Sequence, residues 1–189
     1  MRGDKREQIL RVLLASKAIL SKNEISKQAE CSRQWVILFL KELERKKLTR
    51  NTKPLSRKKL LQYWLGLSKK PRKFRSYMVK EPLEILKHTK LNYALTTYQA
   101  ENIVQHHLFP SRIDLYINET DLEKWHDLLT KNGLYGKGNV KLIFADKYAM
   151  YGKRIINGLS IVSMPQLIVD LIKEGGPCRE AGEMLMEKV

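Results

Sequence analysis

The stretch SKNEISKQAECSRQWVILFLKELERKKL, residues 21–48, decides the first part of the fold. Its opening residue, Ser21, precedes Glu24 by three positions, which is the spacing of a capping box at the start of a helix. A second serine, Ser32, is placed to cap a longer helix that runs to about Lys46. The stretch therefore predicts a short helix, a tight turn and a longer helix.

Apolar spacing supports the longer helix and adds one before the stretch. Val36, Leu40 and Leu43 recur at intervals of four and three residues, so they share one face of the longer helix. Apolar residues at helical spacing also predict a helix over 5–15. Helix, short helix, turn and longer helix is the plan of a helix-turn-helix.

This order resembles the winged helix-turn-helix family of transcription regulators over about fifty residues. In that family a hairpin called the wing follows the third helix; residues 48–50 would open it here and residues 51–54 would turn it. The resemblance implies that the helix over 32–46 is a recognition helix, whose first residues meet base edges in the major groove. Arg33 and Gln34 are then the residues predicted to contact bases. Arg can form two hydrogen bonds to guanine, and Gln can form two to adenine.

Charge is distributed unevenly along the chain. Residues 1–80 hold 23 Lys and Arg against 6 Asp and Glu, whereas residues 81–189 hold 13 against 14, within a net charge of +16. A local excess of this size selects a polyanionic partner. The cations expected to contact phosphates are Lys22, Lys27, Lys41, Arg45, Arg50, Lys53, Arg57, Lys58, Lys70, Arg72, Lys73 and Arg75.

The predicted recognition helix also carries six consecutive apolar residues, WVILFL at 35–40, so its first turns are apolar on every side. Two explanations are open. Either Trp35, Leu38 and Phe39 pack against the wing and another domain, or this face contacts a second copy or another partner. In the second case the DNA role falls to the surrounding Lys and Arg.

A basic linker is predicted over 56–80. Ser56 can cap a helix whose apolar residues, Trp64 among them, form one broad stripe. The run KKPRKFR at 69–75 contains Pro71 and is predicted to be an extended, mobile arm that follows a phosphate backbone. A solvated linker is the alternative.

Residues 81–189 change to alternating strands and helices, which predicts a second domain with a small mixed sheet. Asn157-Gly158 signals a hairpin between 154–156 and 159–163, and Gly175-Gly176 is expected to end a helix that begins near Pro165. Further strands are predicted over 92–96, 111–117 and 139–144, and helices over 98–106, 121–129 and 177–185. The predicted class is α+β: an N-terminal all-helical winged helix-turn-helix domain (1–55), the linker (56–80) and a small mixed α/β domain (81–189).

Several segments together resemble the AbiEi-type antitoxins of type IV toxin-antitoxin systems. They are YALTTYQAENIV at 93–104, FPSRIDLYI at 109–117, GNVKLIF at 138–144 and LSIVSMPQLIVDLIKEGGPCREAGEML at 159–185. The resemblance covers most of the chain and implies repression of its own operon through double-stranded promoter DNA. It also implies neutralisation of a nucleotidyltransferase-type toxin encoded beside it, with no catalytic centre and no cofactor. The expected protein is a regulator and not an enzyme.

A metal-dependent nuclease is the remote alternative. Asp114 and Asp146 lie near predicted strands, where two carboxylates could hold a metal ion. Asp146 is followed directly by Lys147, however, so in a strand the two side chains point to opposite faces. A structural salt bridge or a cap is therefore expected for both aspartates, and no metal site is predicted.

The remaining expectations concern partners and compartment. An RNA-binding or toxin-binding adaptor without operator recognition is the main alternative to the regulator. Palindromic or repeated DNA half-sites are expected only if the protein forms a homodimer or binds cooperatively. No apolar run reaches the roughly 18 residues of a membrane span, and Cys31 and Cys178 have no partner at disulfide or zinc spacing. The expected protein is cytoplasmic and does not enter a membrane.

Overall fold

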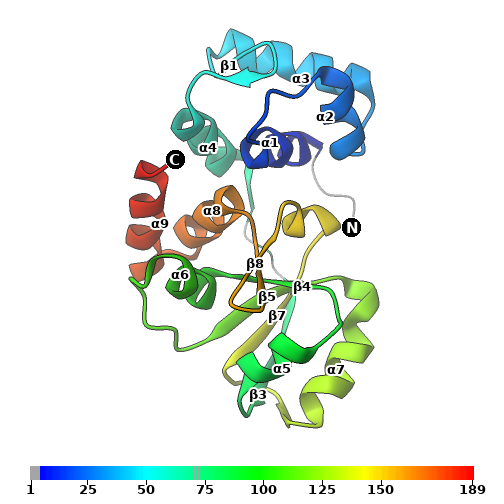
Figure 1. The fold of residues 1–189 in the computed structure, drawn as a ribbon, viewed down its shortest axis with the longest axis vertical. Helices are drawn as coiled ribbons and strands as arrows, with labels where there is room; N and C mark the ends of the chain where they lie inside the picture. Colours follow the sequence, from blue (N-terminus) through cyan, green and yellow to red (C-terminus); the bar gives the residue numbers. More distant parts are fainter. Residues whose placement is uncertain (1–4, 70, 72) are drawn as a thin grey trace.

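The computed structural model describes residues 5–69, 71 and 73–189. This part of the chain forms nine α-helices and nine strands, which confirms the α+β class predicted from the sequence. A helical part stacks on a larger part built around a sheet, which we call the sheet part (Figure 1). The two parts meet where α1 (Lys5–Ala15) and α4 (Arg57–Leu67) contact α8 (Met164–Glu174).

Two helices of the helical part begin at the predicted caps Ser21 and Ser32. Its further elements are α2 (Lys22–Gln28), α3 (Arg33–Arg45), β1 (Thr49–Arg50) and β2 (Lys53–Pro54). Ser21 Oγ accepts the Glu24 N–H at 3.2 Å, and Glu24 Oε2 accepts the Ser21 N–H at 2.7 Å, so the capping box of α2 is complete. Ser32 Oγ accepts the Trp35 N–H at 3.2 Å at the start of α3. Because β1 and β2 pair antiparallel after α3, the order of elements is compatible with a winged helix-turn-helix.

The apolar run on α3 divides between the core and the surface. Val36, Leu40 and Leu43 are buried on the predicted face. Phe39 is also buried, with its ring centroid 6.4 Å from that of Tyr63 on α4. Trp35 and Leu38 remain 43% and 58% exposed. Packing within the chain therefore accounts for Phe39 but is the wrong explanation for Trp35 and Leu38.

The sheet of the larger part has seven strands in the order β6-β3-β7-β5-β4-β9-β8. They are β3 (Phe74–Val79), β4 (Tyr93–Thr96), β5 (Ile113–Ile117), β6 (Gly133–Tyr135), β7 (Val140–Phe144), β8 (Arg154–Ile156) and β9 (Leu159–Ile161). The pairs β5–β7 and β4–β9 are parallel and the other neighbours are antiparallel. The mixed sheet predicted from the sequence is therefore present.

The prediction of a mobile arm over 69–75 is wrong from Phe74 onward. Phe74 opens β3, which is hydrogen-bonded on both sides, to β6 and to β7. Tyr77 and Val79 are buried, whereas Phe74 and Met78 on the other face are 52% exposed. The preceding Lys and Arg obscure this alternation in the sequence, because a basic run is typical of a linker. The sheet thus includes residues that the sequence predicts as linker.

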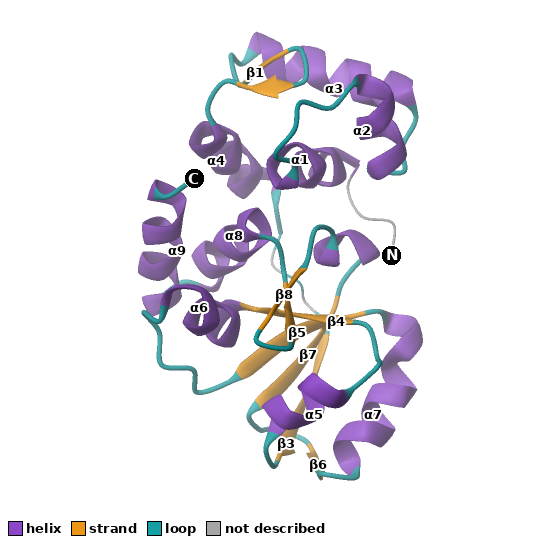
Figure 2. Ribbon diagram, viewed as in Figure 1, coloured by secondary structure: helices purple, strands orange, loops and turns teal. Residues whose placement is uncertain are grey.

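Helices cover the sheet unequally on its two faces (Figure 2). The helices of this part are α5 (Pro82–His88), α6 (Thr97–Gln105), α7 (Leu122–Thr130) and α9 (Pro177–Glu187), with 3-10 turns η1 (Glu119–Asp121) and η2 (Lys147–Met150). On one face, Tyr77 contacts His126 of α7, and Tyr93 donates to the Leu86 carbonyl of α5 at 2.8 Å. On the other face, α8 packs with α6 and α9 and separates the sheet from the helical part.

Within the described residues, no helix combines the length and apolar character that crossing a membrane requires.

Candidate functional site

The first candidate site is the outer surface of α3. Arg33, Gln34, Lys41 and Arg45 are exposed on a helix whose opposite face is buried. Arg33 and Gln34 lie in the first turn, directly after the Ser32 cap. The helix therefore presents the predicted base readers at its start and two cations further along.

The turn between α2 and α3 is fixed by local hydrogen bonds. Ser26 Oγ donates to the Cys31 carbonyl at 2.6 Å, and Glu30 adopts a positive φ of 44° that reverses the chain. Lys27 is exposed in the last turn of α2, and Lys22, in its first turn, is half-buried. Both predicted phosphate contacts of α2 thus belong to the same compact unit as α3.

The hairpin after α3 brings two more cations together. Arg50 and Lys53 are cross-strand partners, so their side chains share one face, and both are exposed. Asn51, at a positive φ of 55°, forms the tip, and its N–H donates to Glu44 Oε1 of α3 at 2.5 Å. This bond ties the hairpin to the helix that carries Arg33 and Gln34. We call the surface formed by α2, α3 and this hairpin the basic face; its cations are Lys22, Lys27, Arg33, Lys41, Arg45, Arg50 and Lys53.

The other predicted phosphate contacts lie elsewhere. The Arg57 guanidinium donates to the Leu14 and Ser16 carbonyls and so holds α4 against the end of α1. Lys58 donates to Glu187 of α9 at 2.5 Å. These bonds give Arg57 and Lys58 structural partners, which the sequence did not signal.

The described residues of the predicted arm do not belong to the basic face. Lys73 precedes β3 and lies 3.5 Å from Glu119, and Arg75 lies within β3, with its guanidinium 6.0 Å from the ring centroid of Tyr135. Both therefore belong to the sheet part. Lys70 and Arg72 lie outside the residues that the structure describes.

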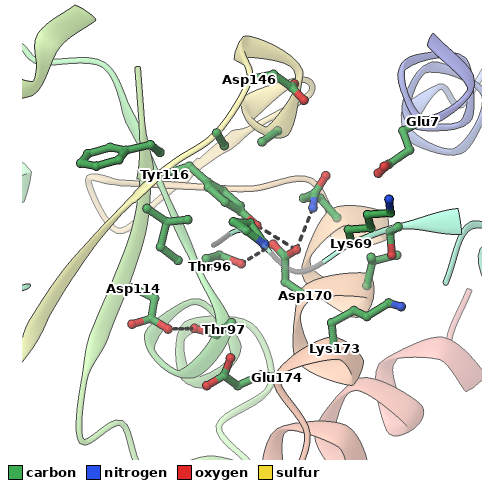
Figure 3. A pocket seen from close by; sticks show the side chains of 18 of the residues that line it. Glu7, Lys69, Thr96, Thr97, Asp114, Tyr116, Asp146, Asp170, Lys173 and Glu174 are labelled. Atoms are coloured by element: carbon green, nitrogen blue, oxygen red, sulfur yellow. Dashed lines mark hydrogen bonds between the residues drawn. The ribbon is translucent and has the colours of Figure 1, made fainter. Parts of the chain in front are cut away.

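The second candidate site is a cavity of about 490 Å³ at the junction between the helical part and the sheet part, which we call the junction cavity (Figure 3). Its lining comes from α1, from Ser68, Lys69, Pro71 and Lys73, from β4, α6, β5 and β7, from η2 and the two residues before it, and from α8. Sequence reasoning missed this cavity because its lining residues are scattered from Glu7 to Glu174. No single segment carries a motif for it.

Asp170 of α8 lies at the centre of a hydrogen-bond network in this cavity. Its carboxylate accepts from Thr96 Oγ1 at 2.6 Å, from Gln166 Nε2 at 2.8 Å and from the Tyr116 hydroxyl at 2.9 Å. Burial raises the pKa of Asp170 to about 6, although these hydrogen bonds and the charge of Arg11 oppose the rise. Burial, and then the neighbouring Asp170, also raises the pKa of Tyr116 well above its ordinary value.

Arg11 carries this network into the helical part. Its Nε donates to Gln166 Oε1 at 2.7 Å, and its guanidinium lies 5.3 Å from the ring centroid of Trp64 on α4. Trp64 Nε1 donates to Glu7 at 2.9 Å, and the Glu7 carboxylate lies 3.6 Å from Arg11 Nη2. Polar contacts therefore run without a break from α4 and α1 to α8 and the sheet.

Asp114 and Asp146 have the structural roles expected of them. Arg112 holds Asp114 through two bonds, at 2.5 Å from Nε and 2.8 Å from Nη2, and Thr97 adds a third at 2.9 Å. Asp146 caps η2 by accepting the Tyr148 N–H at 2.8 Å. Among the described residues, no three His, Cys, Asp or Glu side chains are grouped to hold a metal ion.

Comparison with protein-family models, with curated proteins and with solved structures found no match.

Proposed function

We propose that the protein is a DNA-binding transcription regulator that grips double-stranded DNA of its own promoter with the basic face. The observation that carries this proposal is α3 itself. It starts at a capped turn, buries one face in the core, and exposes Arg33 and Gln34 where a recognition helix meets base edges. The winged helix-turn-helix role of this unit is part of the proposal.

Electrostatics favours the same reading. Six exposed cations of the basic face make no ion pair with any described residue: Lys27, Arg33, Lys41, Arg45, Arg50 and Lys53. Arg50 and Lys53 are directly opposite each other, and like charges so placed repel. A phosphate between them would relieve that repulsion and release counterions.

The exposed apolar residues of α3 also suit a DNA groove. Leu38 is one turn beyond Gln34 on the same helix and is 58% exposed. Major-groove edges include the thymine methyl group, which apolar side chains contact. A helix that presents Gln34 beside Leu38 is therefore suited to A·T pairs.

The test is fluorescence anisotropy with a duplex from upstream of the gene and a scrambled duplex of equal composition. The unaltered protein should prefer the upstream duplex, and Arg33→Ala with Gln34→Ala should abolish that preference while retaining salt-dependent binding. Lys90→Gln with Lys131→Gln, two exposed sites on the sheet part, is the matched control. If Arg33→Ala with Gln34→Ala still prefers the upstream duplex, these two residues do not recognise its bases. Stronger binding of transfer RNA than of duplex DNA would favour the adaptor instead.

The second proposed activity is that of an antitoxin, in which the sheet part binds the nucleotidyltransferase-type toxin that the resemblance implies. The favouring observation is an apolar strip at the β3–β6 end of the sheet. Met78 and Leu134 are cross-strand partners, 52% and 74% exposed, and Phe74 lies on the same face of β3. Exposed apolar residues gathered in one patch are typical of protein contacts.

Co-expression with the protein encoded by the adjacent gene tests this activity. Met78→Ser with Leu134→Ser should abolish co-purification and relief of toxicity, because both side chains would leave the contact. Ile155→Ser, at a 79% exposed apolar site on the opposite edge strand β8, is the control and should retain both. Co-purification that survives loss of Met78 and Leu134 would rule out this strip as the contact.

A further inference from the structure

The acidic side chains of the junction cavity already have partners. Five carboxylates line it, and each accepts a hydrogen bond from within the protein: Glu7 from Trp64, Asp114 from Thr97 and Arg112, Asp146 from the Tyr148 N–H, Asp170 from three donors, and Glu174 from Arg112. Their negative charge is therefore directed at internal donors.

Four groups in the same cavity that can donate lack such partners among the described residues. Lys69 and Lys173 line it and form no ion pair with the described residues. Arg11 Nη1 and Ser68 Oγ are buried there, and neither has a hydrogen-bond acceptor in the part of the chain that is described. Buried polar atoms are nearly always hydrogen-bonded, so two orphaned donors in one cavity indicate a missing acceptor.

These donors, on Arg11, Ser68, Lys69 and Lys173, all line the same cavity. Figure 3 shows Lys69 between Glu7 of α1 and Lys173 of α8, on the α8 side of the cavity. Lys69 is exposed, so this side opens to solvent, whereas Arg11 is only 7% exposed and lies deeper. A ligand entering past Lys69 would meet positive charge at the mouth and unsatisfied donors inside.

We propose that this cavity binds a small organic anion, whose acidic group is held by Lys69, Lys173, Ser68 and Arg11. Its volume of about 490 Å³ lies within the range of small-molecule sites. Ile143 and Val169 supply an apolar wall for the body of the ligand. The acidic group is a phosphate ester or a carboxylate, since both accept charge-assisted hydrogen bonds from these donors. The inference is independent of DNA binding.

The test uses two fluorescent probes that differ in one group. The anionic probe is 8-anilinonaphthalene-1-sulfonate, and N-phenyl-1-naphthylamine is its neutral counterpart. The full-length protein should bind one equivalent of the sulfonate, and Lys69→Gln with Lys173→Gln should weaken that binding by about tenfold or more, which is the loss of about 1.4 kcal/mol. Binding of the neutral amine should change by less than about twofold.

Two further variants separate the cavity from other surfaces. Ala145→Phe fills the cavity at a half-buried lining position and should abolish sulfonate binding, whereas Lys90→Gln with Lys131→Gln should leave it unchanged. Thermal unfolding of each variant checks that it is folded. Sulfonate binding that survives either Ala145→Phe or the Lys69 and Lys173 substitutions overturns the proposal.

Displacement of the sulfonate identifies the source of the acidic group. Adenosine 5′-monophosphate represents phosphate esters, and benzoate represents carboxylates. Displacement by either supports the proposal and assigns the class, while failure of both to displace the probe counts against it. Because the readout is ligand fluorescence, a negative result in the DNA assay leaves this test interpretable.

Discussion

Replacing Asp170 by Asn should change how the stability of the protein depends on pH. Asp170 is buried at the junction, and burial raises its pKa from 3.8 to about 6. A raised pKa means that the folded state holds a proton that the unfolded state releases between these two values. The contribution of Asp170 to stability is therefore fully present below about pH 4 and is lost as pH rises through about 6.

The size of the effect follows from the two pKa values. At about 1.4 kcal/mol per pH unit, the interval from 3.8 to about 6 corresponds to about 3 kcal/mol of lost stability by pH 7. The asparagine side chain does not ionise, so Asp170→Asn removes this loss. One of the three hydrogen bonds to Asp170 would lose its acceptor, because an amide has one oxygen, at a pH-independent cost of about 1 kcal/mol.

Urea unfolding at pH 4, 5, 6 and 7, followed by circular dichroism, measures this difference. The free energy of unfolding of Asp170→Asn minus that of the unaltered protein should rise by about 2.4 kcal/mol from pH 4 to pH 7, because the unfolded-state carboxyl is already partly ionised at pH 4. Subtracting the two proteins in the same buffer cancels every group that the substitution leaves alone. If the difference stays flat or falls with rising pH, Asp170 is not a buried carboxylate with a raised pKa.

Three further substitutions test packing and capping by the same unfolding measurement. Ser32→Ala should cost about 1 kcal/mol, because the Trp35 N–H loses its cap; no loss would mean that α3 does not need it. Gly182→Val should cost about 1–3 kcal/mol, since a Cβ there would lie 2.8 Å from Ile172 Cγ1 and 3.0 Å from Leu171 Cβ of α8; a neutral result would contradict the close approach of α9 to α8. Arg112→Gln should cost about 3 kcal/mol, because it leaves the buried Asp114 carboxylate without its ion pair; equal stability would show that Thr97 alone suffices.

Elements with local signals were predictable from the sequence. Ser21, Glu24 and Ser32 mark the helix starts through bonds within three residues, and these bonds form. Asn157-Gly158 likewise turns the β8–β9 hairpin, with Asn157 at a positive φ of 51° and Gly158 at 77°. Such signals depend on neighbouring residues alone, so they can be recognised without knowledge of the tertiary fold.

Features that depend on distant residues could not be predicted in the same way. β3 is hidden by the basic run before it, and its burial comes from β6 and β7, which lie far along the chain. Arg57 and Lys58 resemble free cations in the sequence, yet their partners are carbonyls at the end of α1 and Glu187 of α9. The junction cavity is harder still to predict from the sequence, because Arg11 and Gln166, which are hydrogen-bonded there, are separated by 155 positions. Only the fold brings such residues together.

The most direct test of the proposed DNA role is the salt dependence of binding to the upstream duplex. If each of the six exposed cations of the basic face neutralises one phosphate, the slope of log K against log salt should be about −5. Lys41→Gln with Arg45→Gln should reduce its magnitude by about 1.8, and Lys90→Gln with Lys131→Gln should leave it unchanged. A slope near zero for the unaltered protein, or equal slopes for all three proteins, would contradict DNA binding through the basic face.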